Sequence, residues 1–300
     1  MNPIRFDGRV AVVTGAGGGL GRAHALLLAS RGAKVVVNDP GGAVNGVGGD
    51  DAAAHRVVAE IRAAGGEAVA SLHSVSEPEG ARAIVQVAAD TWGRVDVLVN
   101  NAGILRDKSL VKMDPADFAS VVAVHLLGSA WCTQAALPHM QAQGYGRIVM
   151  TTSAAGLYGN FGQTNYGAAK LGLVGLMNSL KLEVQKHGIL VNTVAPVALT
   201  RMTEGLGFST LLAEATPERV AAAVAFLASE ACTFSGEIVS AGAGYFSRVQ
   251  IVEGPGVHLP PEGITPEGVA DAWPVIAAMD GAQPFASATA ALAAIFSPRG

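Results

Sequence analysis

The sequence predicts an α/β fold: a Rossmann-type, doubly wound parallel sheet of about seven strands, with helices on both faces and a C-terminal extension. Two observations predict it. Short β-branched runs alternate with longer helical stretches along most of the chain. The runs are apolar throughout, which is typical of strands buried on both faces of a parallel sheet. Right-handed crossovers between consecutive strands then give the doubly wound arrangement.

The expected elements follow one another in a regular order. β-branched and apolar residues gather in the runs expected as strands, at residues 9–14, 34–39, 67–72, 95–100, 147–152, 189–195 and 237–240. Longer stretches between them are expected as helices, at residues 20–31, 51–64, 77–92, 115–143, 165–187 and 217–229. From Gln250 onward Pro and Gly become frequent. We therefore expect one domain, residues 1–249, and an extension, residues 250–300, that carries a helix near residues 266–279 and docks on the core.

Composition excludes several classes of protein. Half of the residues are hydrophobic, 15% are charged and the formal net charge is −4, which suits a large buried core and no nucleic-acid or anionic-membrane partner. Cys132 and Cys232 lie far apart and the His residues are scattered, so neither a disulfide framework nor a metal site is expected. We see no signal peptide and no apolar run long enough to span a bilayer, so the expected localisation is cytoplasmic.

A glycine-rich loop joins the first expected strand to the first expected helix. It has the sequence Thr14-Gly15-Ala16-Gly17-Gly18-Gly19-Leu20-Gly21. Glycines let the backbone approach a pyrophosphate, and the helix N-terminus behind them supplies N–H donors and the positive end of a dipole. The position between a strand and a helix distinguishes a dinucleotide site from a structural turn. The residues expected to bind a dinucleotide are Gly15, Gly17, Gly19, Leu20 and Gly21.

Asp39 ends the second expected strand. A carboxylate at this place accepts hydrogen bonds from the adenosine ribose and repels the 2′-phosphate of NADP. No Arg or Lys directly follows Asp39 to offset that repulsion, so NAD is the expected cofactor. The alternative is a solvated Asp that starts a turn.

Tyr166 and Lys170 lie one turn apart at the start of an expected helix and therefore share a helix face. A Lys ammonium near the phenol favours phenolate and lowers the Tyr pKa, which suits Tyr166 to general acid–base chemistry. Ser153 ends the fifth expected strand, from which it can reach the same crevice and hydrogen-bond a substrate oxygen. A Tyr-x-x-x-Lys pair is common on helix surfaces, and its coincidence with Ser153 and the glycine loop makes it specific.

These motifs, together with Asn100-Asn101-Ala102-Gly103, resemble in order and spacing the short-chain dehydrogenases/reductases over roughly residues 5–245. The resemblance implies a nicotinamide dinucleotide cofactor, with Asn101, Ala102 and Gly103 against its adenine side. It also implies that Tyr166 takes the alcohol proton while hydride leaves for the nicotinamide. Ser153 would then polarise the substrate oxygen, and Lys170 would lower the Tyr166 pKa and hold the cofactor ribose.

Longer stretches resemble one branch of that family, the (3R)-hydroxyacyl-CoA dehydrogenases of type 2 peroxisomal multifunctional enzymes and their bacterial single-domain relatives, which include hydroxysteroid dehydrogenases. They span residues 5–10, 36–42, 101–107 and 158–166. The resemblance implies a role in lipid metabolism, with a hydrophobic acyl-CoA or steroid substrate and a homodimer or a homotetramer built from it. No hydratase or sterol-carrier segment follows, so only the dehydrogenase step is implied.

Three positions depart from the family pattern. His125 stands where the family has a catalytic Asn, and it either holds a water in a proton relay beside Lys170 or only shapes the long helix. His73-Ser74-Val75 replaces the usual Asp after the third strand, which leaves Ser74 and Val75 as candidates for the adenine contact. Pro-Gly after the sixth strand becomes Pro196-Val197, so the further cofactor contacts expected there are Pro196, Val197 and Thr200.

Residues 199–214 are apolar and contain glycine, and they are either a lid over the substrate or an ordinary amphipathic helix. Asn160, Phe161 and Gln163 are expected at the pocket entrance. The apolar long helix and the stretch from residue 171 to 182 leave a broad face uncovered, which predicts a symmetric homo-oligomer.

Two other functions stay open. A 3-oxoacyl-carrier-protein reductase would draw on NADPH, which Asp39 disfavours. It would also need a basic docking patch, for which the candidates are Arg106, Lys108 and Arg201. From another class, a non-catalytic NAD-binding scaffold or sensor would explain His125, although the intact Ser, Tyr and Lys set argues against it.

Overall fold

A computed structural model describes residues 3–46, 48, 50, 52–198 and 214–296. The chain divides into two compact units, Met1–Arg248 and Val249–Gly300. This boundary lies one residue before the one expected from composition. Each unit is described by itself.

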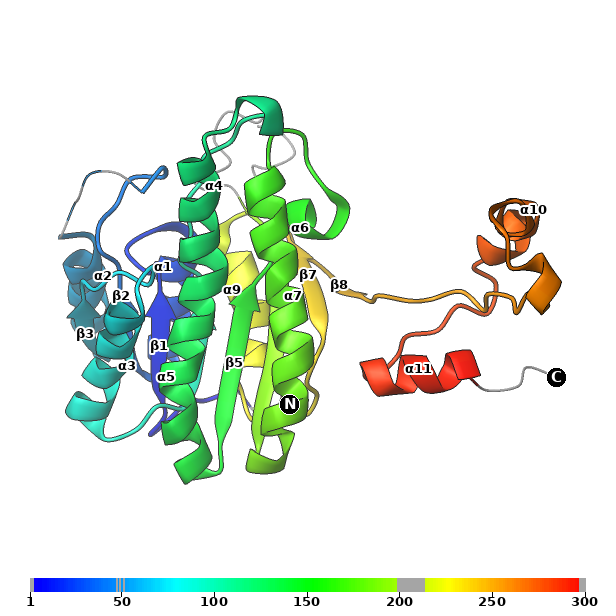
Figure 1. Cartoon of the computed structure of the whole chain (residues 1–300). Helices are drawn as coiled ribbons and strands as arrows, with labels where there is room; N and C mark the ends of the chain where they lie inside the picture. The colour runs from blue at the N-terminus through cyan, green and yellow to red at the C-terminus, as the bar shows by residue number, and fades with distance from the viewer. Residues whose placement is uncertain (1–2, 47, 49, 51, 199–213, 297–300) are drawn as a thin grey trace. The chain divides into compact units, whose positions relative to one another are not determined.

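The first unit is built on one eight-stranded sheet with the strand order β3-β2-β1-β4-β5-β6-β7-β8 (Figure 1). The strands are β1 (Val10–Thr14), β2 (Lys34–Asn38), β3 (Glu67–Ser71), β4 (Val97–Asn100), β5 (Gly146–Thr151), β6 (Ile189–Val197), β7 (Ile238–Gly242) and β8 (Tyr245–Val249). All pairs from β3 to β7 are parallel. The order reverses between β1 and β4, and open α/β sheets bind ligands at the carboxyl ends of the strands flanking such a point. The predicted fold class is confirmed.

The eighth strand was not expected from the sequence. Ala243 and Gly244 join β7 to β8, and both have positive φ, 50° and 83°. A two-residue turn of this kind reverses the chain into an antiparallel hairpin. The hairpin adds an edge strand to an otherwise parallel sheet.

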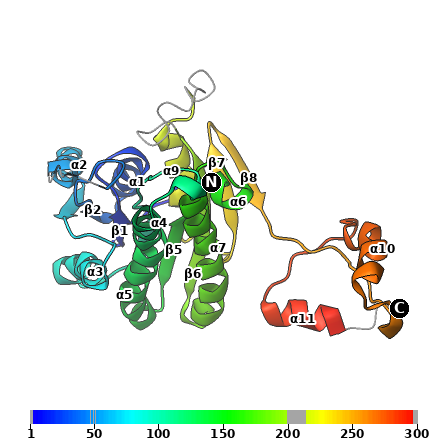
Figure 2. The same ribbon diagram turned by 45° about the horizontal axis from the view of Figure 1, so that its top comes forward.

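Helices cover both faces of the sheet. Figure 2 shows α1, α2 and α9 on one face and α3, α5 and α7 on the other. The helices of this unit are α1 (Gly19–Ser30), α2 (Ala52–Ala63), α3 (Pro78–Trp92), α4 (Pro115–Val122), α5 (Gly128–Gln143), α6 (Ala154–Tyr158), α7 (Thr164–Val184) and α9 (Pro217–Leu227). The short helix α6 was not predicted. A π-helical segment, Ala123–Leu127, joins α4 to α5, so the long helix expected at residues 115–143 is present with one irregular turn.

The apolar strands form the core. Every residue of β1, β4 and β5 is buried, as the continuous apolar runs predict.

Asp96 holds together the amino-terminal edge of the sheet, where strands β1 and β4 begin. Its fully buried carboxylate accepts hydrogen bonds from Val10 N at 2.9 Å and from the guanidinium groups of Arg9 and Arg94 at 2.9 and 2.7 Å. Burial opposes the charge on Asp96, but these donors outweigh burial and hold its pKa below the ordinary value.

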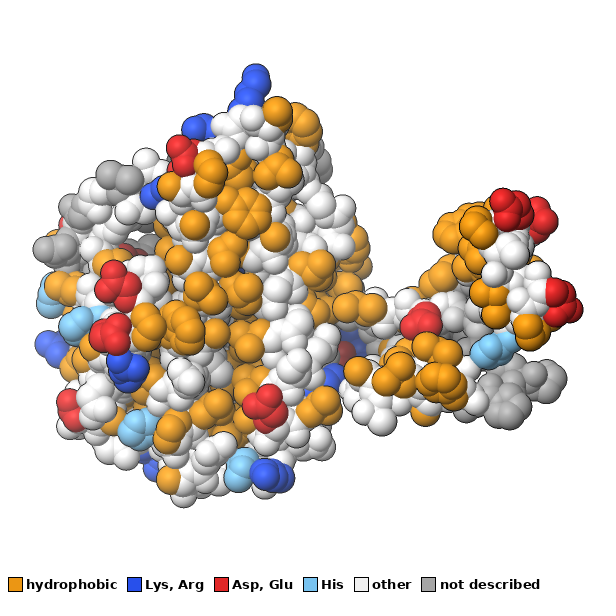
Figure 3. Space-filling model, in the orientation of Figure 1, with side chains coloured by type: hydrophobic (Ala, Val, Ile, Leu, Met, Phe, Trp, Pro, Cys, Tyr) orange, Lys and Arg blue, Asp and Glu red, His pale blue; other side chains and the backbone are white. Residues whose placement is uncertain are grey.

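The stretch Pro115–Gln143 is long and apolar enough to cross a membrane by length and composition, with 39% of its most apolar window buried. It packs against α3 and α7, however, and contributes to the sheet-covering layer. Apolar side chains gather over α5 and α7 on the face drawn in Figure 3. The exposed leucines of the π-helical segment and of α7 include Leu127, Leu171 and Leu182, at 39%, 45% and 54%.

In its described residues the second unit holds two α-helices, α10 (Pro266–Ile276) and α11 (Ala288–Phe296), after a short 3-10 turn at Pro261–Gly263. Thr265 caps α10 by accepting a hydrogen bond from Gly268 N at 3.0 Å. Glu253 and Gln283 close the unit with a pair of backbone hydrogen bonds, each 3.0 Å long. The helix expected near residues 266–279 is present, and α11 was not predicted. The docking of residues 250–300 on the core stays a prediction.

Candidate active site

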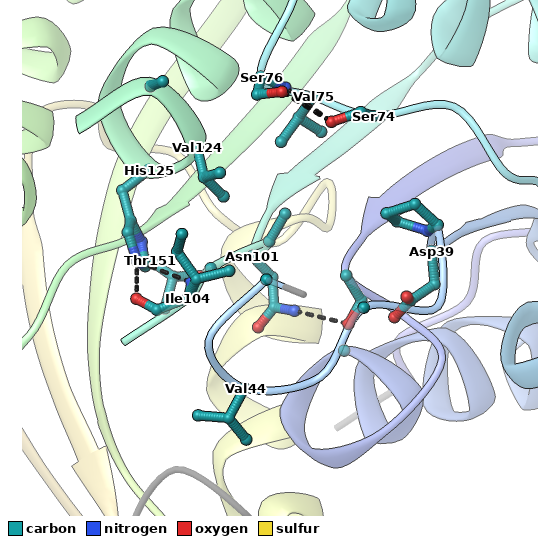
Figure 4. A pocket seen from close by; sticks show the side chains of 18 of the residues that line it. Asp39, Val44, Ser74, Val75, Ser76, Asn101, Ile104, Val124, His125 and Thr151 are labelled. Carbon is teal, nitrogen blue, oxygen red and sulfur yellow. Dashed lines mark hydrogen bonds between the residues drawn. The ribbon is translucent and has the colours of Figure 1, made fainter. Parts of the chain in front are cut away.

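A cavity of about 500 Å³ opens at the carboxyl ends of the parallel strands. It runs from the glycine loop after β1 to the first turns of α7. Figure 4 shows lining side chains that include Asp39 after β2, Asn101 after β4 and His125. Residues that end β2 and β5, Asn38 and Thr151, also line it. The cavity thus lies at the point where the strand order reverses.

The backbone of the glycine loop forms one wall of the cavity. Neighbouring atoms leave no room for a Cβ at Gly15 or Gly21. Gly15 has φ +63°, and a Cβ there would lie 2.7 Å from Ala102 Cα. A Cβ on Gly21 would lie 2.2 Å from Gly15 O. Asn101 Nδ2 holds the loop by donating to Thr14 O at 2.9 Å and to Gly15 O at 3.1 Å. These contacts bring the start of α1 against the segment after β4.

The N-terminus of α1 faces the cavity. Gly18 is its N-cap and offers no side-chain hydrogen bond, and Gly19, Leu20 and Gly21 line the cavity. The first N–H groups of a helix have no partner within the helix and attract anions. Donors of the kind that hold a pyrophosphate are therefore present where the sequence predicted them.

Asp39 lies at the end of β2 and lines the same cavity. Gly17 N donates to its Oδ2 at 2.9 Å and Gly41 N to its Oδ1 at 2.7 Å. A Cβ on Gly17 would lie 2.7 Å from Asp39 Oδ2. Gly17 therefore orients the carboxylate and does not itself line the cavity.

The segment after β3 forms the adjoining wall. Ser74 and Val75, the two candidates for the adenine contact, both line the cavity, and Ser76 and Glu77 join them. Ser74 Oγ accepts a hydrogen bond from Ser76 N at 3.2 Å, which shapes the turn. Sequence reasoning missed Ser76 and Glu77 because they follow the strand end without a motif of their own.

The catalytic candidates gather at the other end. Tyr166 and Lys170 line the cavity from the first turns of α7. Lys170 is 3% exposed, and its Nζ donates to Thr151 O at 2.6 Å and lies 5.5 Å from the centre of the Tyr166 ring. Ser153 caps α6, where its Oγ accepts from Ala155 N at 3.2 Å. The Ser153 hydroxyl lies close enough to Tyr166 to lower the pKa of its phenol, although Ser153 does not line the cavity.

Burial sets the charge states of this group. It lowers the pKa of Lys170 to about 7, because the ammonium loses water and no carboxylate among the described residues pairs with it. Burial likewise raises the pKa of Tyr166, and the hydrogen bond with Ser153 opposes that rise while the charge of Asp107 adds to it. The expectation that Lys170 lowers the Tyr166 pKa considered charge alone. In this structure burial reverses the direction.

His125 lies on the π-helical segment and lines the cavity beside Tyr166. Its Nε2 lies 2.8 Å from Ile104 O and 3.1 Å from Ile104 N (Figure 4). Its ring meets the Tyr166 ring edge-on, at 5.1 Å between centres. Burial, and then the charge of Lys170, hold the His125 pKa well below its ordinary value, so the ring is neutral.

His125 Nδ1 is buried and has no hydrogen-bond partner among the described residues. Its tautomer decides whether that nitrogen donates or accepts. The same ring explains Gly103, because a Cβ there would lie 2.2 Å from His125 Cε1. The π-helical turn is of a kind frequent at functional sites.

Asn165 is a site residue that sequence reasoning missed. It is fully buried, and its Nδ2 donates to Arg106 O at 3.0 Å while its Oδ1 accepts from Tyr166 N at 2.7 Å. Its amide thereby fixes the turn that carries Tyr166. The only signal in the sequence is its place next to Tyr166.

The residues expected at the entrance lie on the loop before α7. Gln163 donates to Asp107 Oδ2 at 2.7 Å and accepts from Asn160 at 2.9 Å, and Phe161 is 91% exposed. None of the three lines the cavity itself.

The contacts expected after β6 are only partly brought together. Pro196 lines the cavity, whereas Val197 is 43% exposed and does not line it. Thr200 and Arg201 lie outside the described residues, and so does the expected lid except for its last residue. In the described part of the chain, no group of three or more His, Cys, Asp or Glu residues could hold a metal ion.

Comparison with known proteins places this geometry among known folds. A family model described as short chain dehydrogenase matches residues 9–208. The peroxisomal multifunctional enzyme type 2 of Drosophila melanogaster is 52% identical over 90% of this chain, which spans 45% of that protein. Its structure matches with a TM-score of 0.83 at 43% identity, over 97% of this chain and 49% of the other.

Two further matches extend over most of the other protein. A putative short-chain type dehydrogenase/reductase of Mycobacterium tuberculosis is 49% identical over 92% of this chain and 96% of its own length. The structure of a 7α-hydroxysteroid dehydrogenase complexed with NADH and 7-oxo glycochenodeoxycholic acid matches with a TM-score of 0.70 at 30% identity, over 80% of this chain and 95% of the other.

The buried lysine makes stability depend on pH. Lys170 is protonated in the unfolded chain up to its ordinary pKa of 10.5, but in the folded protein only up to about 7. Between these values the unfolded chain binds more protons, so the folded state gains stability as pH rises. We expect the free energy of unfolding of the parent to rise relative to that of Lys170→Met across this window, by at most ~1.4 kcal/mol per pH unit.

Urea unfolding at several pH values, without nucleotide, measures this difference. Lys186→Met removes an exposed charge just after α7 and controls for the change in net charge. A gap between parent and Lys170→Met that stays constant from pH 6.5 to about 10 would show that burial does not suppress the Lys170 charge.

Proposed function

Because the chain belongs to the short-chain dehydrogenase family, we propose that it oxidises a 3-hydroxyacyl-CoA or a hydroxysteroid with NAD⁺. Family membership makes it an oxidoreductase that interconverts a secondary alcohol and a ketone. One observation carries the finer proposal: Tyr166 and Lys170 line the same cavity as the glycine loop and Asp39. A dinucleotide held at one end of this cavity therefore brings its reactive end to the proton-transfer group.

The residues at the adenine end fit a nicotinamide dinucleotide. A Cβ at Gly15, Gly17 or Gly21 would collide with neighbouring protein atoms, so glycine keeps this loop close-packed, and the uncapped N-terminus of α1 offers donors to a pyrophosphate. Asp39 would accept from the adenosine ribose, and the walls after β3 and β4 would hold the adenine. When bound, the nicotinamide supplies the carbon that accepts or gives the hydride.

Tyr166 moves the proton. As a phenolate, after passing its own proton toward Lys170, it would take the proton of the alcohol during oxidation, and as a phenol it would give a proton to the substrate oxygen during reduction, while Ser153 hydrogen-bonds that oxygen. Lys170 would hold the nicotinamide ribose, and its pKa of about 7 leaves both its charged and its neutral form populated near neutral pH. Its neutral amine can therefore accept a proton, and its ammonium can donate one.

His125 continues the path of the proton. Its Nδ1 is buried and has no hydrogen-bond partner in the described part of the chain, and the ring lies beside Tyr166 and close enough to Lys170 for the lysine charge to act on it. A water held by this nitrogen would link Lys170 to solvent, in place of the water that the family holds with Asn. His125 would then be a member of the catalytic set and not only a packing residue.

The relatives support the substrate class. The 52% identical relative is a peroxisomal multifunctional enzyme, and a matching structure is a hydroxysteroid dehydrogenase. The carrier-protein reductase gains no support from the basic residues. Arg106 and Lys108 both pair with Asp117, at 3.0 and 3.5 Å, which neutralises part of the patch.

The oligomeric state and the cellular location are also part of the proposal. The apolar face over α5 and α7 supports a homodimer, or a homotetramer built from it (Figure 3). A cytoplasmic location is proposed on the composition of the chain, although several relatives carry peroxisomal names.

Tyr166→Phe tests the central role. The phenyl ring keeps the packing but loses the proton, so we expect kcat to fall by about 10²–10⁴-fold. The NAD⁺ dissociation constant should change far less. Tyr158→Phe is the matched control, because Tyr158 is 74% exposed at the end of α6. NADH formation at equal rates in Tyr166→Phe and parent, with an active substrate, would refute the proposed mechanism.

Asp39→Asn tests cofactor choice. The amide keeps the size of the side chain but removes the charge that repels a 2′-phosphate. We expect the kcat/KM for NADP⁺ relative to that for NAD⁺ to rise by about tenfold or more. Asp50→Asn, at the exposed far end of the same loop, controls for the loss of one charge. An unchanged cofactor ratio would leave Asp39 with a structural role only.

A further inference from the structure

The residues that follow Asp39 form a strap along the cavity, defined here as residues 40–46. Pro40, Gly42, Ala43, Val44 and Gly46 all line the cavity, together with Ile104 and Arg106. The strap starts on the carboxylate of Asp39, which accepts from Gly41 N at 2.7 Å. It therefore reaches from the residue that would hold the adenosine ribose toward the catalytic end.

The strap is fastened at its far end to one short segment, Ile104–Arg106. Leu105 N donates to Val44 O at 2.9 Å, and Arg106 Nε donates to Asn45 O at 3.1 Å. A Cβ on Gly46 would lie 3.2 Å from Ile104 Cγ2, so the strap also lies close against the Ile104 side chain. On the strap these attachments are all made by backbone atoms and do not depend on its side chains.

The guanidinium of Arg106 is itself held in place. Its Nη1 donates to Asp117 Oδ1 at 3.0 Å and to Ser120 Oγ at 3.3 Å, both on α4. The side chain is 24% exposed. Since one edge of the group is fixed on α4, its Nε is aimed at the strap.

The backbone of the same residue holds the catalytic helix. Arg106 O accepts from Asn165 Nδ2 at 3.0 Å, and Asn165 Oδ1 accepts from Tyr166 N at 2.7 Å. Two residues earlier, the main chain of Ile104 bonds His125. Three residues thus connect the strap, His125 and the turn that carries Tyr166.

We propose that Arg106 is a positioning residue that fastens the strap over the bound dinucleotide and couples cofactor retention to the placement of Tyr166. The inference rests on the proposed function and names a residue that the family motifs do not include. It also explains why Arg is needed. Lys has a single ammonium and cannot direct separate donors to Asn45 O and to Asp117 in one fixed geometry.

Binding and hydrogen exchange without substrate test the proposal. Calorimetry gives the NAD⁺ dissociation constant, and amide exchange is followed in residues 40–46 and in the first turns of α7. In the parent, NAD⁺ should slow exchange in both segments. In Arg106→Lys we expect a dissociation constant about fivefold higher, faster exchange of the strap and no slowing in α7.

Lys108→Met is the matched control. Lys108 pairs with the same carboxylate, Asp117, at 3.5 Å, and lies on the same loop. We expect its NAD⁺ affinity and strap exchange to match those of the parent. If Arg106→Lys does not fold, Asp117→Asn removes the anchor of the guanidinium and should give the same changes in weaker form.

The two proposals fail differently. If the parent binds no NAD⁺, the proposed function is wrong. If the parent binds NAD⁺ and Arg106→Lys, or Asp117→Asn in its place, binds it equally well with unchanged exchange in the strap and in α7, the coupling role of Arg106 is wrong. Faster exchange throughout the first unit would likewise overturn the coupling, because it would mark a general loss of stability.

Discussion

A buried lysine that has no counter-ion among the described residues is the constraint on which the site depends. Lys170 is 3% exposed and is held by the backbone oxygen of Thr151. A charge in such surroundings is costly unless a partner compensates it. Lys170 carries this desolvation cost between the end of β5 and the start of α7. The cost favours the neutral amine and lowers the pKa of Lys170 to about 7. Tyr166 and His125 share this dry environment, which favours their neutral forms, so of the three only Lys170 has a pKa near neutral pH.

The sheet explains why these groups meet the glycine loop. Parallel strands bring every carboxyl end to one edge, and the reversal of strand order between β1 and β4 leaves a crevice there. Asn101 locks the glycine loop to the end of β4, and Gly103 makes room for the His125 ring. Cofactor residues and catalytic residues therefore depend on the same few close backbone approaches. A side chain larger than hydrogen at Gly15, Gly21 or Gly103 would disturb both ends of the cavity.

Much of this could be predicted from the sequence, because the informative patterns are local. The expected strands agree with those observed to within a few residues, and the glycine loop, Asp39, Tyr166 and Lys170 all line one cavity. What was missed depends on contacts between segments far apart in the chain. The bonds from Leu105 and Arg106 to the strap, and from Asn165 to Arg106, follow no periodicity. The direction of the Tyr166 pKa was mistaken for a related reason, since burial cannot be read from a Tyr-x-x-x-Lys spacing.

The central claim is that the phenol of Tyr166, the amine of Lys170 and the nicotinamide meet at one end of the cavity. A crystal structure of the protein with NAD⁺ bound tests this most directly. We expect the nicotinamide ribose hydroxyls within hydrogen-bond distance of Lys170 Nζ and the nicotinamide ring facing the Tyr166 hydroxyl, with the pyrophosphate at the start of α1. A dinucleotide bound in the opposite direction, or a phenol turned away from the nicotinamide, would contradict the account.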